Sequence, residues 1–500
     1  MLRPVPFGLR PLRLARCSAI NRVQPCFRRG FSHSAFQQQQ QQQDERTWST
    51  PLAKKLSQAI SITGPVPLAS YMRMCLTGDL GGYYTGAIED TRDQFGTKGD
   101  FITSPEISQV FGELIGIWFV AEWMSQGSPK SGVQLIEVGP GRGTLMDDML
   151  RTIKRFPAMA NSIDAVYMVE ASRELRETQK NLLCGKDAQS TESSVGIHAP
   201  GKHNGKPIVW TESIKSIPID PSKMPFIVAH EFFDALPIHA FESVATPSEP
   251  EPQEGDRPSK PKPKEATEWR EMMVSPTPPG ATHADLGTPK SEQHQPVPEF
   301  QLIMSSIPTR HSRYVPESSP RYRKLKPTPG SVVEVCPDAS LYASDFATRI
   351  GGSPKSPKAT PSGAALILDY GTSDTIPINS LRGIRQHKRV SPFSEPGLVD
   401  LSVDVDFTAI AEAAMLASEG IEVHGPIGQG DFLELMGIRE RAEILTKAPG
   451  VSQESADKIQ QSWKRLVDRG PGGMGKLYKA LAILPENDGR RRPVGFGGDI

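Results

Sequence analysis

The chain has 500 residues, of which 37% are hydrophobic and 23% are charged, and its formal net charge is zero. This composition is ordinary for a chain that buries a hydrophobic core, and the balanced charge gives no indication of nucleic acid as a partner. The five cysteines form no CxxC pair, so a disulfide framework or a structural zinc site is not expected, and no metal ligands are predicted. The most apolar stretch, residues 110–124, carries Glu113 and Glu122 and is too short and too charged to be a transmembrane segment.

The first 43 residues contain seven arginines, no lysine and no acidic residue. An arginine-rich start without acids is typical of a mitochondrial transit peptide, and Arg29–Ser32 resembles a processing site of matrix presequences. We therefore expect a transit peptide over residues 1–31, a low-complexity spacer over 32–47 and localisation in the mitochondrial matrix. The alternative is a basic disordered arm that binds nucleic acid.

Residues 48–127 are predicted to form an N-terminal helical or cap region. The sequence indicates two short helices over 51–62 and 67–77, because Gly64 and Pro65 interrupt the pattern between them. In a longer helix that follows, large apolar residues recur at i, i+3 and i+4 over 111–123. We expect this stripe to pack in the hydrophobic core.

Short apolar runs that alternate with helical segments predict an α/β fold with a parallel sheet covered on both faces. We expect helices over 144–156 and 172–184 between the first three of these runs. The predicted core domain covers residues 128–375. The runs are 133–138, 165–170, 207–210, 225–230 and 364–370.

Residues 245–299 hold 12 of the chain's 46 prolines and almost no aliphatic side chains, so we expect a disordered surface insertion in the core domain. Within it, only 269–274 has the pattern of a strand, which could pair with 300–305 as a hairpin. After Tyr370 the sequence predicts loops and helices, with a basic loop over 381–389. Residues 376–484 are expected to form a C-terminal substrate-binding region, and 485–500 a tail.

A glycine-rich turn follows the first predicted strand directly and reads Gly139-Pro140-Gly141-Arg142-Gly143 before a helix begins at Thr144. Glycine allows a tight turn and close approach of a ligand, and a strand, turn and helix N-terminus together make a nucleotide-type pocket. The spacing is GxGxG rather than the GxGxxG of dinucleotide sites. Two alternatives to a methyltransferase remain open here. One is an NAD-type dehydrogenase, and the other is a sheet that has lost its cofactor.

The turn resembles motif I of class I (Rossmann-like) S-adenosylmethionine-dependent methyltransferases, whose cofactor carries a cationic sulfonium and no phosphate. This resemblance implies that Gly139, Gly141 and Gly143 line the cofactor, with the acidic Glu137 near its amino-acid end. The second predicted strand ends at Glu170, whose carboxylate can accept hydrogen bonds from both ribose hydroxyls. We therefore expect S-adenosyl-L-methionine as the cofactor and a class I methyltransferase sheet with added N-terminal and C-terminal segments.

A longer series of segments resembles the MidA family, a mitochondrial complex I assembly factor that is a protein arginine methyltransferase. The resemblance implies symmetric dimethylation of an arginine in a core matrix-arm subunit of NADH:ubiquinone oxidoreductase. This sequence departs from the family pattern in its longer insertion and in Ala229-His230, where an Asn beside Glu231 is more usual. The segments are 99–108, 111–118, 135–150, 229–241, 367–371, 381–389, 396–407, 427–441 and 471–481.

Two acidic residues, Glu231 and Asp234, follow the fourth predicted strand and should lie on the same rim of the sheet as the glycine turn. Guanidinium is delocalised and protonated at any workable pH, so a methyltransferase must position it, and a carboxylate can do so through paired hydrogen bonds. We expect Glu231 to clamp the guanidinium and Asp234 to assist. In the alternative, Asp234 only caps the following turn.

Further candidate substrate-binding residues lie in two loops. In the segment 99–108, Thr103 or Ser104 could cap a helix with Glu106 in its first turn, or the loop could fold over the site and add Asp100, Ser104 or Glu106 to it. The basic loop with His387 is either solvated or part of a surface that binds the substrate protein. Other open functions are a non-catalytic assembly chaperone and a small-molecule methyltransferase, and the oligomeric state is not predicted.

Overall fold

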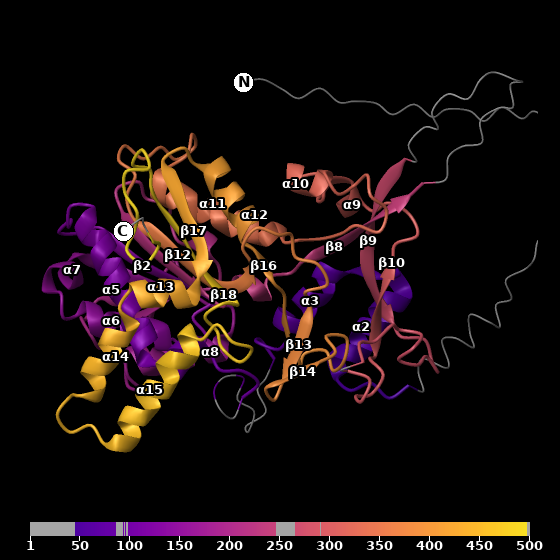
Figure 1. Ribbon diagram of the computed structural model, residues 1–500, viewed down its shortest axis with the longest axis horizontal. Coiled ribbons are helices and arrows are strands. Elements are labelled where there is room, and N and C mark those ends of the chain that lie inside the picture. Colours follow the sequence, from indigo (N-terminus) through magenta and orange to yellow (C-terminus); the bar gives the residue numbers. More distant parts are fainter. Residues whose placement is uncertain are drawn as a thin grey trace, which may run out of the picture. The chain divides into compact units, whose positions relative to one another are not determined.

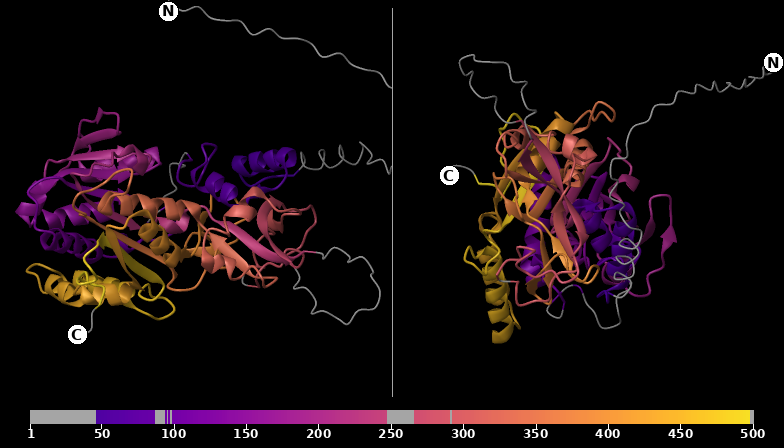
Figure 2. Two further views of the ribbon diagram at one scale, coloured as in Figure 1. Left: turned by 90° about the horizontal axis from the view of Figure 1, so that it is seen from above. Right: turned by 90° about the vertical axis from the view of Figure 1, so that its right-hand side faces the viewer.

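The computed structural model describes residues 46–86, 94, 96, 99–246, 266–290 and 292–497 (Figures 1 and 2). Residues from Trp48 onward form one unit, described here. The predicted transit peptide lies outside the described residues, as do residues 32–45 of the spacer. In the described part, no helix has both the length and the apolar character needed to cross a membrane.

The core of the unit is a mixed sheet in the order β17-β18-β12-β7-β2-β3-β6-β5-β4. Its five central strands run parallel, and all five were predicted, with ends that differ by at most two residues. They are β2 (Val133–Val138), β3 (Ile163–Val169), β6 (Pro207–Thr211), β7 (Met224–His230) and β12 (Ala364–Thr372). Every residue of β2 is buried, as expected for a central strand covered on both faces. This confirms the predicted α/β fold.

The edges of this sheet are built from antiparallel strands and one short parallel strand. On one side β18 lies antiparallel between β12 and β17, and on the other β5 and β4 extend the sheet beyond β6. The short β16 pairs in parallel with β12. Their bounds are β4 (Thr191–Glu192), β5 (Ile197–Pro200), β16 (Val405–Asp406), β17 (Ile421–Gly428) and β18 (Tyr478–Pro485).

Helices cover both faces of the sheet, as Figures 1 and 2 show. On one face α5 packs against α6, and its predicted apolar stripe is buried from Phe111 to Trp123. On the opposite face α11 and α12 pack together over alternate residues of the same strands. The first layer contains α5 (Gln109–Ser125), α6 (Thr144–Ile153), α7 (Pro157–Ser162), α8 (Arg173–Leu183), α13 (Gln429–Leu435), α14 (Ile438–Thr446) and α15 (Gln453–Val467); the second contains α11 (Pro337–Gly351) and α12 (Phe407–Ala417).

A second sheet with its own hydrophobic cluster carries helices α2 (Pro51–Thr63) and α3 (Leu68–Thr77). Its order is β1-β9-β8-β11, with β10 also pairing with β9. A third, three-stranded sheet has the order β14-β13-β15. The bounds are β1 (Val66–Pro67), β8 (His239–Ala245), β9 (Thr267–Pro276), β10 (Phe300–Met304), β11 (Val332–Val335), β13 (Arg382–Arg385), β14 (Lys388–Val390) and β15 (Asp400–Ser402).

The structure corrects the prediction that residues 245–299 are one disordered insertion. The expected hairpin is present as β9 and β10, but β9 also pairs with β8 and buries Trp269, so this part belongs to the second sheet. The strand itself was predicted over 269–274, but nothing in the sequence indicated its pairing with β8, which lies on the other side of the proline-rich connection. Residues 247–265 lie outside the described residues.

Three C-terminal predictions are also corrected. The basic segment 381–389, expected as a loop, is a hairpin of β13 and β14, with Gln386 and His387 at positive φ in its turn. The segment 477–484, expected among loops and helices, contributes the buried strand β18. Because β17 and β18 complete the main sheet, the predicted boundary at residue 375 cuts through the core domain instead of ending it.

Candidate active site

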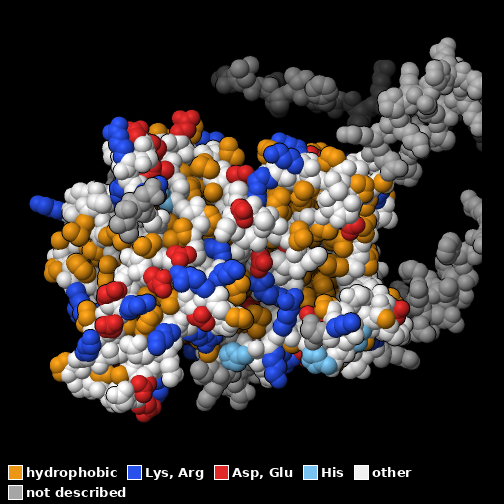
Figure 3. Space-filling model, viewed as in Figure 1, with side chains coloured by type: hydrophobic (Ala, Val, Ile, Leu, Met, Phe, Trp, Pro, Cys, Tyr) orange, Lys and Arg blue, Asp and Glu red, His pale blue; other side chains and the backbone are white. Residues whose placement is uncertain are grey.

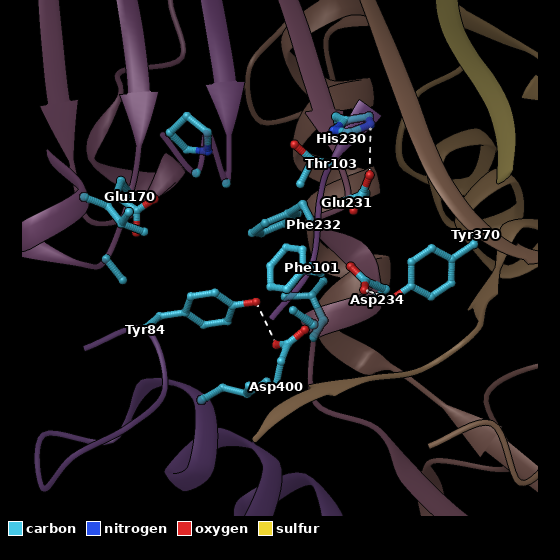
Figure 4. Close-up of a pocket in the computed structure, with 18 of the residues that line it drawn as sticks. Tyr84, Phe101, Thr103, Glu170, His230, Glu231, Phe232, Asp234, Tyr370 and Asp400 are labelled. Atoms are coloured by element: carbon cyan, nitrogen blue, oxygen red, sulfur yellow. Dashed lines mark hydrogen bonds and ion pairs between the residues drawn. The ribbon is translucent and has the colours of Figure 1, made fainter. Parts of the chain in front are cut away.

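A cavity of about 760 Å³ lies at the carboxyl ends of β2, β3, β7 and β12 (Figure 4). This is the edge of an α/β sheet where ligands bind, and the volume is typical of a small-molecule or cofactor site. Its wall combines the glycine turn after β2 with side chains from the loop after α3 and from the third sheet, such as Tyr84 and Asp400. The cavity is therefore shared between the main sheet and the added segments.

The glycine turn depends on glycine at each of its three positions, where φ is +69°, +50° and +83° for Gly139, Gly141 and Gly143. A Cβ on Gly139 would meet the Phe232 ring at 2.6 Å. Gly139 and Gly141, which are expected to line the cofactor, line the cavity. Gly143 does not line it, because it forms the N-cap of α6 and lies against Gln179.

Two buried carboxylates, Glu137 and Glu170, line the cavity beside this turn. Burial and the nearby Glu170 raise the pKa of Glu137 well above its usual value, and its Oε2 has no hydrogen-bond partner. Burial likewise raises the pKa of Glu170 to about 7, although the Ser172 N–H donates to its Oε1 at 2.8 Å. Buried carboxylates that line a cavity fit a cationic ligand with hydroxyl groups, and S-adenosylmethionine is such a ligand.

The turn after β7 presents Glu231 to the cavity in a strained backbone conformation. Glu231 has a φ of +48°, which is uncommon for a residue with a side chain. Asp369 of β12 holds the turn in place because its Oδ2 accepts the N–H groups of Phe232, Phe233 and Asp234 at 2.9–3.3 Å. The Glu231 N–H also donates to the Leu368 carbonyl at 3.0 Å.

The Glu231 carboxyl is nearly surrounded by protein. The Ser104 N–H donates to its Oε1 at 3.4 Å, and Nε2 of His230 lies 3.3 Å from the same oxygen (Figure 4). Burial lowers the pKa of His230 to about 3, so this imidazole is neutral and does not compensate a negative charge. Burial, followed by Asp234 and Asp369, raises the pKa of Glu231 well above its usual value.

Asp234 is the second predicted acid, and it also lines the cavity. The Tyr370 hydroxyl donates to its Oδ2, and burial raises the pKa of the carboxyl. The Arg382 guanidinium lies 4.5 Å from the centre of the Tyr370 ring and pairs with Asp404 at 2.7 Å. Asp234 therefore has a cavity-facing position as well as a place in the turn.

Several cavity residues were not predicted. The Tyr84 hydroxyl donates to Asp400 Oδ1 at 2.9 Å, and burial raises the pKa of Asp400 to about 7. Phe101 adds an aromatic wall near this pair (Figure 4). The family resemblance pointed to the regions of Tyr370 and Asp400, because both residues lie in segments that carry it. The spacing of residues in the sequence gave no reason to assign either of them a role in the site.

The segment 99–108 both caps a helix and lines the cavity. Thr103 is the N-cap of α4 (Ser104–Ile107), and its N–H donates to Glu106 Oε2 at 3.3 Å. Glu106, a candidate substrate-binding residue, also lies 3.3 Å from Arg142 of the glycine turn and lines the cavity. The two alternatives for this segment are therefore compatible.

Three predicted substrate contacts are absent from the cavity wall. Asp100 is buried and instead accepts from the Tyr83 hydroxyl and the Gln386 N–H, each at 2.8 Å, which ties its loop to the β13–β14 hairpin. Ser104 is fully buried and meets Glu231 only through its backbone. His387 is exposed in the hairpin turn, where Lys and Arg side chains gather (Figure 3).

Comparison with known proteins agrees with this geometry. Residues 114–427 match a family model described as "Putative S-adenosyl-L-methionine-dependent methyltransferase". The chain belongs to this family. It is also 33% identical to the mitochondrial protein arginine methyltransferase NDUFAF7 of Xenopus tropicalis, over 89% of this chain and 88% of the relative. The human protein of the same name is 33% identical over 87% of this chain and 84% of its own length.

The fold also matches solved structures. A protein from Burkholderia thailandensis, crystallised with S-adenosyl-homocysteine, superposes with a TM-score of 0.60 at 21% identity, over 90% of this chain and 93% of that one. The methyltransferase fold predicted from the sequence is confirmed, and so is dependence on S-adenosylmethionine, which the matched family shares. The curated relatives are named as mitochondrial.

Proposed function

We propose that this chain is a protein arginine methyltransferase of the mitochondrial matrix, in which Glu231 and Asp234 hold the substrate guanidinium. The observation that supports this most strongly is the wall of the cavity, where buried acids and aromatic rings adjoin the glycine turn. A guanidinium fits such a wall, since carboxylates pair with its N–H groups and aromatic faces attract the cation. The names of the curated relatives support the same substrate class.

S-adenosylmethionine, when bound, supplies an electrophilic methyl group on a cationic sulfur. Gly139 and Gly141 leave room for it, and Glu137 and Glu170 are the acids that would hold its cationic and hydroxyl groups. On the substrate side, Glu231 orients one terminal nitrogen, and pairing with Asp234 localises the positive charge on another. As the N–C bond forms and the S–C bond breaks, the guanidinium loses one proton, which a cavity carboxylate accepts.

The resemblance to the MidA family supports a core matrix-arm subunit of complex I as the protein substrate. The proposed reaction is symmetric dimethylation of one arginine in that subunit. The hairpin β13–β14 is the proposed contact surface beside the cavity, because Arg382 and Arg389 line the cavity while His387 and Lys388 are exposed at its tip.

The test compares methyl transfer by the wild-type protein with that by Glu231→Gln, using purified core subunits, free arginine and labelled S-adenosylmethionine. We expect methyl-arginine in one subunit, cofactor affinity retained in the variant, and a loss of turnover of about 30-fold or more, since losing one partner of a buried charge pair costs about 2–5 kcal/mol. Glu192→Gln, at an exposed position in β4, is the matched control.

Near-normal turnover by Glu231→Gln would contradict the assigned clamp. Methylation of free arginine but of no subunit would favour a small-molecule enzyme. Binding of a subunit without any methyl transfer would favour the non-catalytic chaperone. Mass spectrometry of matrix proteins from cells with and without the chain would identify the arginine that loses its methyl groups.

A further inference from the structure

Outside the cavity, three metal-ligating side chains from separate elements come together. His239 of β8, Glu271 of β9 and His311 of α9 (Arg310–Tyr314) each place a ligand atom within 4.8 Å of the other two. We propose that these three residues form a binding site for a divalent transition-metal ion of the Zn²⁺ type. This site does not depend on the proposed arginine substrate.

Strand pairing brings the first two ligands to one face of the second sheet. Phe241 lies directly opposite Glu271 in the antiparallel pair of β8 and β9, and His239 is two residues before Phe241 on the same face. His239 Nδ1 therefore reaches Glu271 Oε1 at 2.8 Å. From the other side, α9 supplies His311, whose Nδ1 lies 3.3 Å from the same oxygen.

These separations suit a tetrahedral ion. With metal–ligand bonds of about 2.0–2.2 Å, neighbouring ligand atoms stand about 3.3–3.5 Å apart. One of the two nitrogen–oxygen distances already has this value, and the other needs to open by about half an ångström. The two imidazole rings are close together, with their centroids 4.4 Å apart, so little rearrangement is required.

The carboxylate is fixed in the way that metal ligands usually are. The Thr309 hydroxyl donates to Glu271 Oε2, which leaves Oε1 directed at the two histidines. Glu271 is fully buried beside the apolar Phe241 and Trp269, where an ionised carboxylate needs a cation or several donors. Without an ion, His239 and His311 can stabilise the ionised Glu271 carboxylate only through hydrogen bonds to its Oε1, which both would share.

The donor set indicates the class of ion. Two imidazoles with one carboxylate favour Zn²⁺, Co²⁺ or Ni²⁺ over Mg²⁺ and Ca²⁺, which prefer oxygen ligands only. The His311 side chain is 44% exposed, so an ion and a water molecule as fourth ligand have access. Paired cysteines are the metal-binding pattern that the sequence lacks, whereas these three ligands are spaced 32 and 40 residues apart and form no local motif.

Such an ion would fasten α9 to the second sheet. None of the three ligands lines the methyltransferase cavity, so the site would brace the fold and take no part in methyl transfer. Its connection to the cavity is structural, because β8 begins two residues after Pro237, which does line the cavity.

The experiment titrates Zn²⁺ and Co²⁺ into full-length protein that carries no histidine tag and has been treated with a chelator. We expect one equivalent to bind, the visible d–d bands of tetrahedral Co²⁺ without thiolate charge transfer, and a higher melting temperature with Zn²⁺. His311→Ala should weaken binding at least tenfold and abolish the thermal shift. His198→Ala, a histidine of β5 outside the cluster, should behave as wild type.

His311 is partly exposed, so its replacement should preserve the fold, and the melting temperature without metal verifies this. Glu271→Gln provides a second variant with the same expected loss of Co²⁺ bands. The proposal is overturned if the wild type binds no equivalent of either ion, if His311→Ala binds as tightly as wild type, or if the Co²⁺ spectrum shows thiolate ligands. The cluster would then be a hydrogen-bonded His–Glu–His network only.

Discussion

Glu137 and Glu170 face the same cavity with little to neutralise them. Glu170 receives the Ser172 N–H and a long hydrogen bond from Gln179, whereas Oε2 of Glu137 receives none. Their pKa values are raised because both carboxylates are buried, and in Glu137 also because of the other acid. A cationic ligand that binds beside such buried carboxyl groups favours their ionised form. Perturbed pKa values of this kind are typical of functional sites.

The first prediction is that S-adenosylmethionine binds more tightly as pH rises from about 6 to about 8. The ligand needs ionised carboxylates, and Glu170 has a pKa of about 7 in the unliganded protein, so each unit of pH below that value costs up to tenfold in affinity. Glu170→Gln should weaken binding and reduce the pH dependence. Calorimetry at three pH values measures both, and a wild-type affinity that is constant with pH would contradict the assignment.

At the scale of elements, the glycine turn and the turn after β7 are built against each other. Gly139 leaves no room for a Cβ because the Phe232 ring occupies that space, and Phe232 follows Glu231 directly. The loop predicted to hold the cofactor and the turn that aims the proposed clamp therefore cannot move independently. This packing gives a reason for glycine at 139 beyond its backbone conformation.

The second prediction follows from that packing. Gly139→Ala should lower the melting temperature and weaken S-adenosylmethionine binding at least tenfold, because the new Cβ displaces Phe232. Gly205→Ala is the matched control: Gly205 has the same φ of +69° but no atom within 4 Å of a Cβ, so it carries only the backbone cost of about 1–2 kcal/mol. Equal effects of the two changes on cofactor binding would refute the packing argument.

The sequence predicted those elements whose signal is local. The five parallel strands are continuous apolar runs, and the Gly139–Gly143 turn follows one of them, so both were found. The strand β18 was missed because its apolar run follows the glycine-rich segment 472–475 and resembles a short helix until its neighbours β12 and β17 are known. Asp400 and Tyr84 could not be paired from spacing, since 316 residues separate them and only tertiary packing brings them together.

At the scale of the whole unit, the cavity is formed where the main sheet meets the added segments. The main sheet contributes the glycine turn, Glu231 and Asp234, while the loop after α3 contributes Tyr84 and the third sheet contributes Asp400. A bare methyltransferase sheet would leave these acids open to water, where a guanidinium gains little from a carboxylate. Enclosure by the added segments therefore strengthens the charge pairing on which the proposed reaction depends.

The last prediction concerns the long connection between β8 and β9. These strands pair up to Ala245 and Thr267, and the Thr246 N–H donates to the Ala266 carbonyl at 2.8 Å, so the two ends of residues 247–265 meet in an antiparallel hairpin. A two-residue Asn-Gly turn is favoured at such a position. Because the entropy of loop closure changes slowly with length, replacing 247–265 by Asn-Gly should leave the melting temperature unchanged or slightly higher. Cofactor affinity and turnover should also be unchanged, since none of the described residues at that end of the hairpin, 241–246 and 266–271, lines the cavity. A clear loss of subunit methylation with cofactor affinity intact would instead assign the proline-rich connection to substrate recognition.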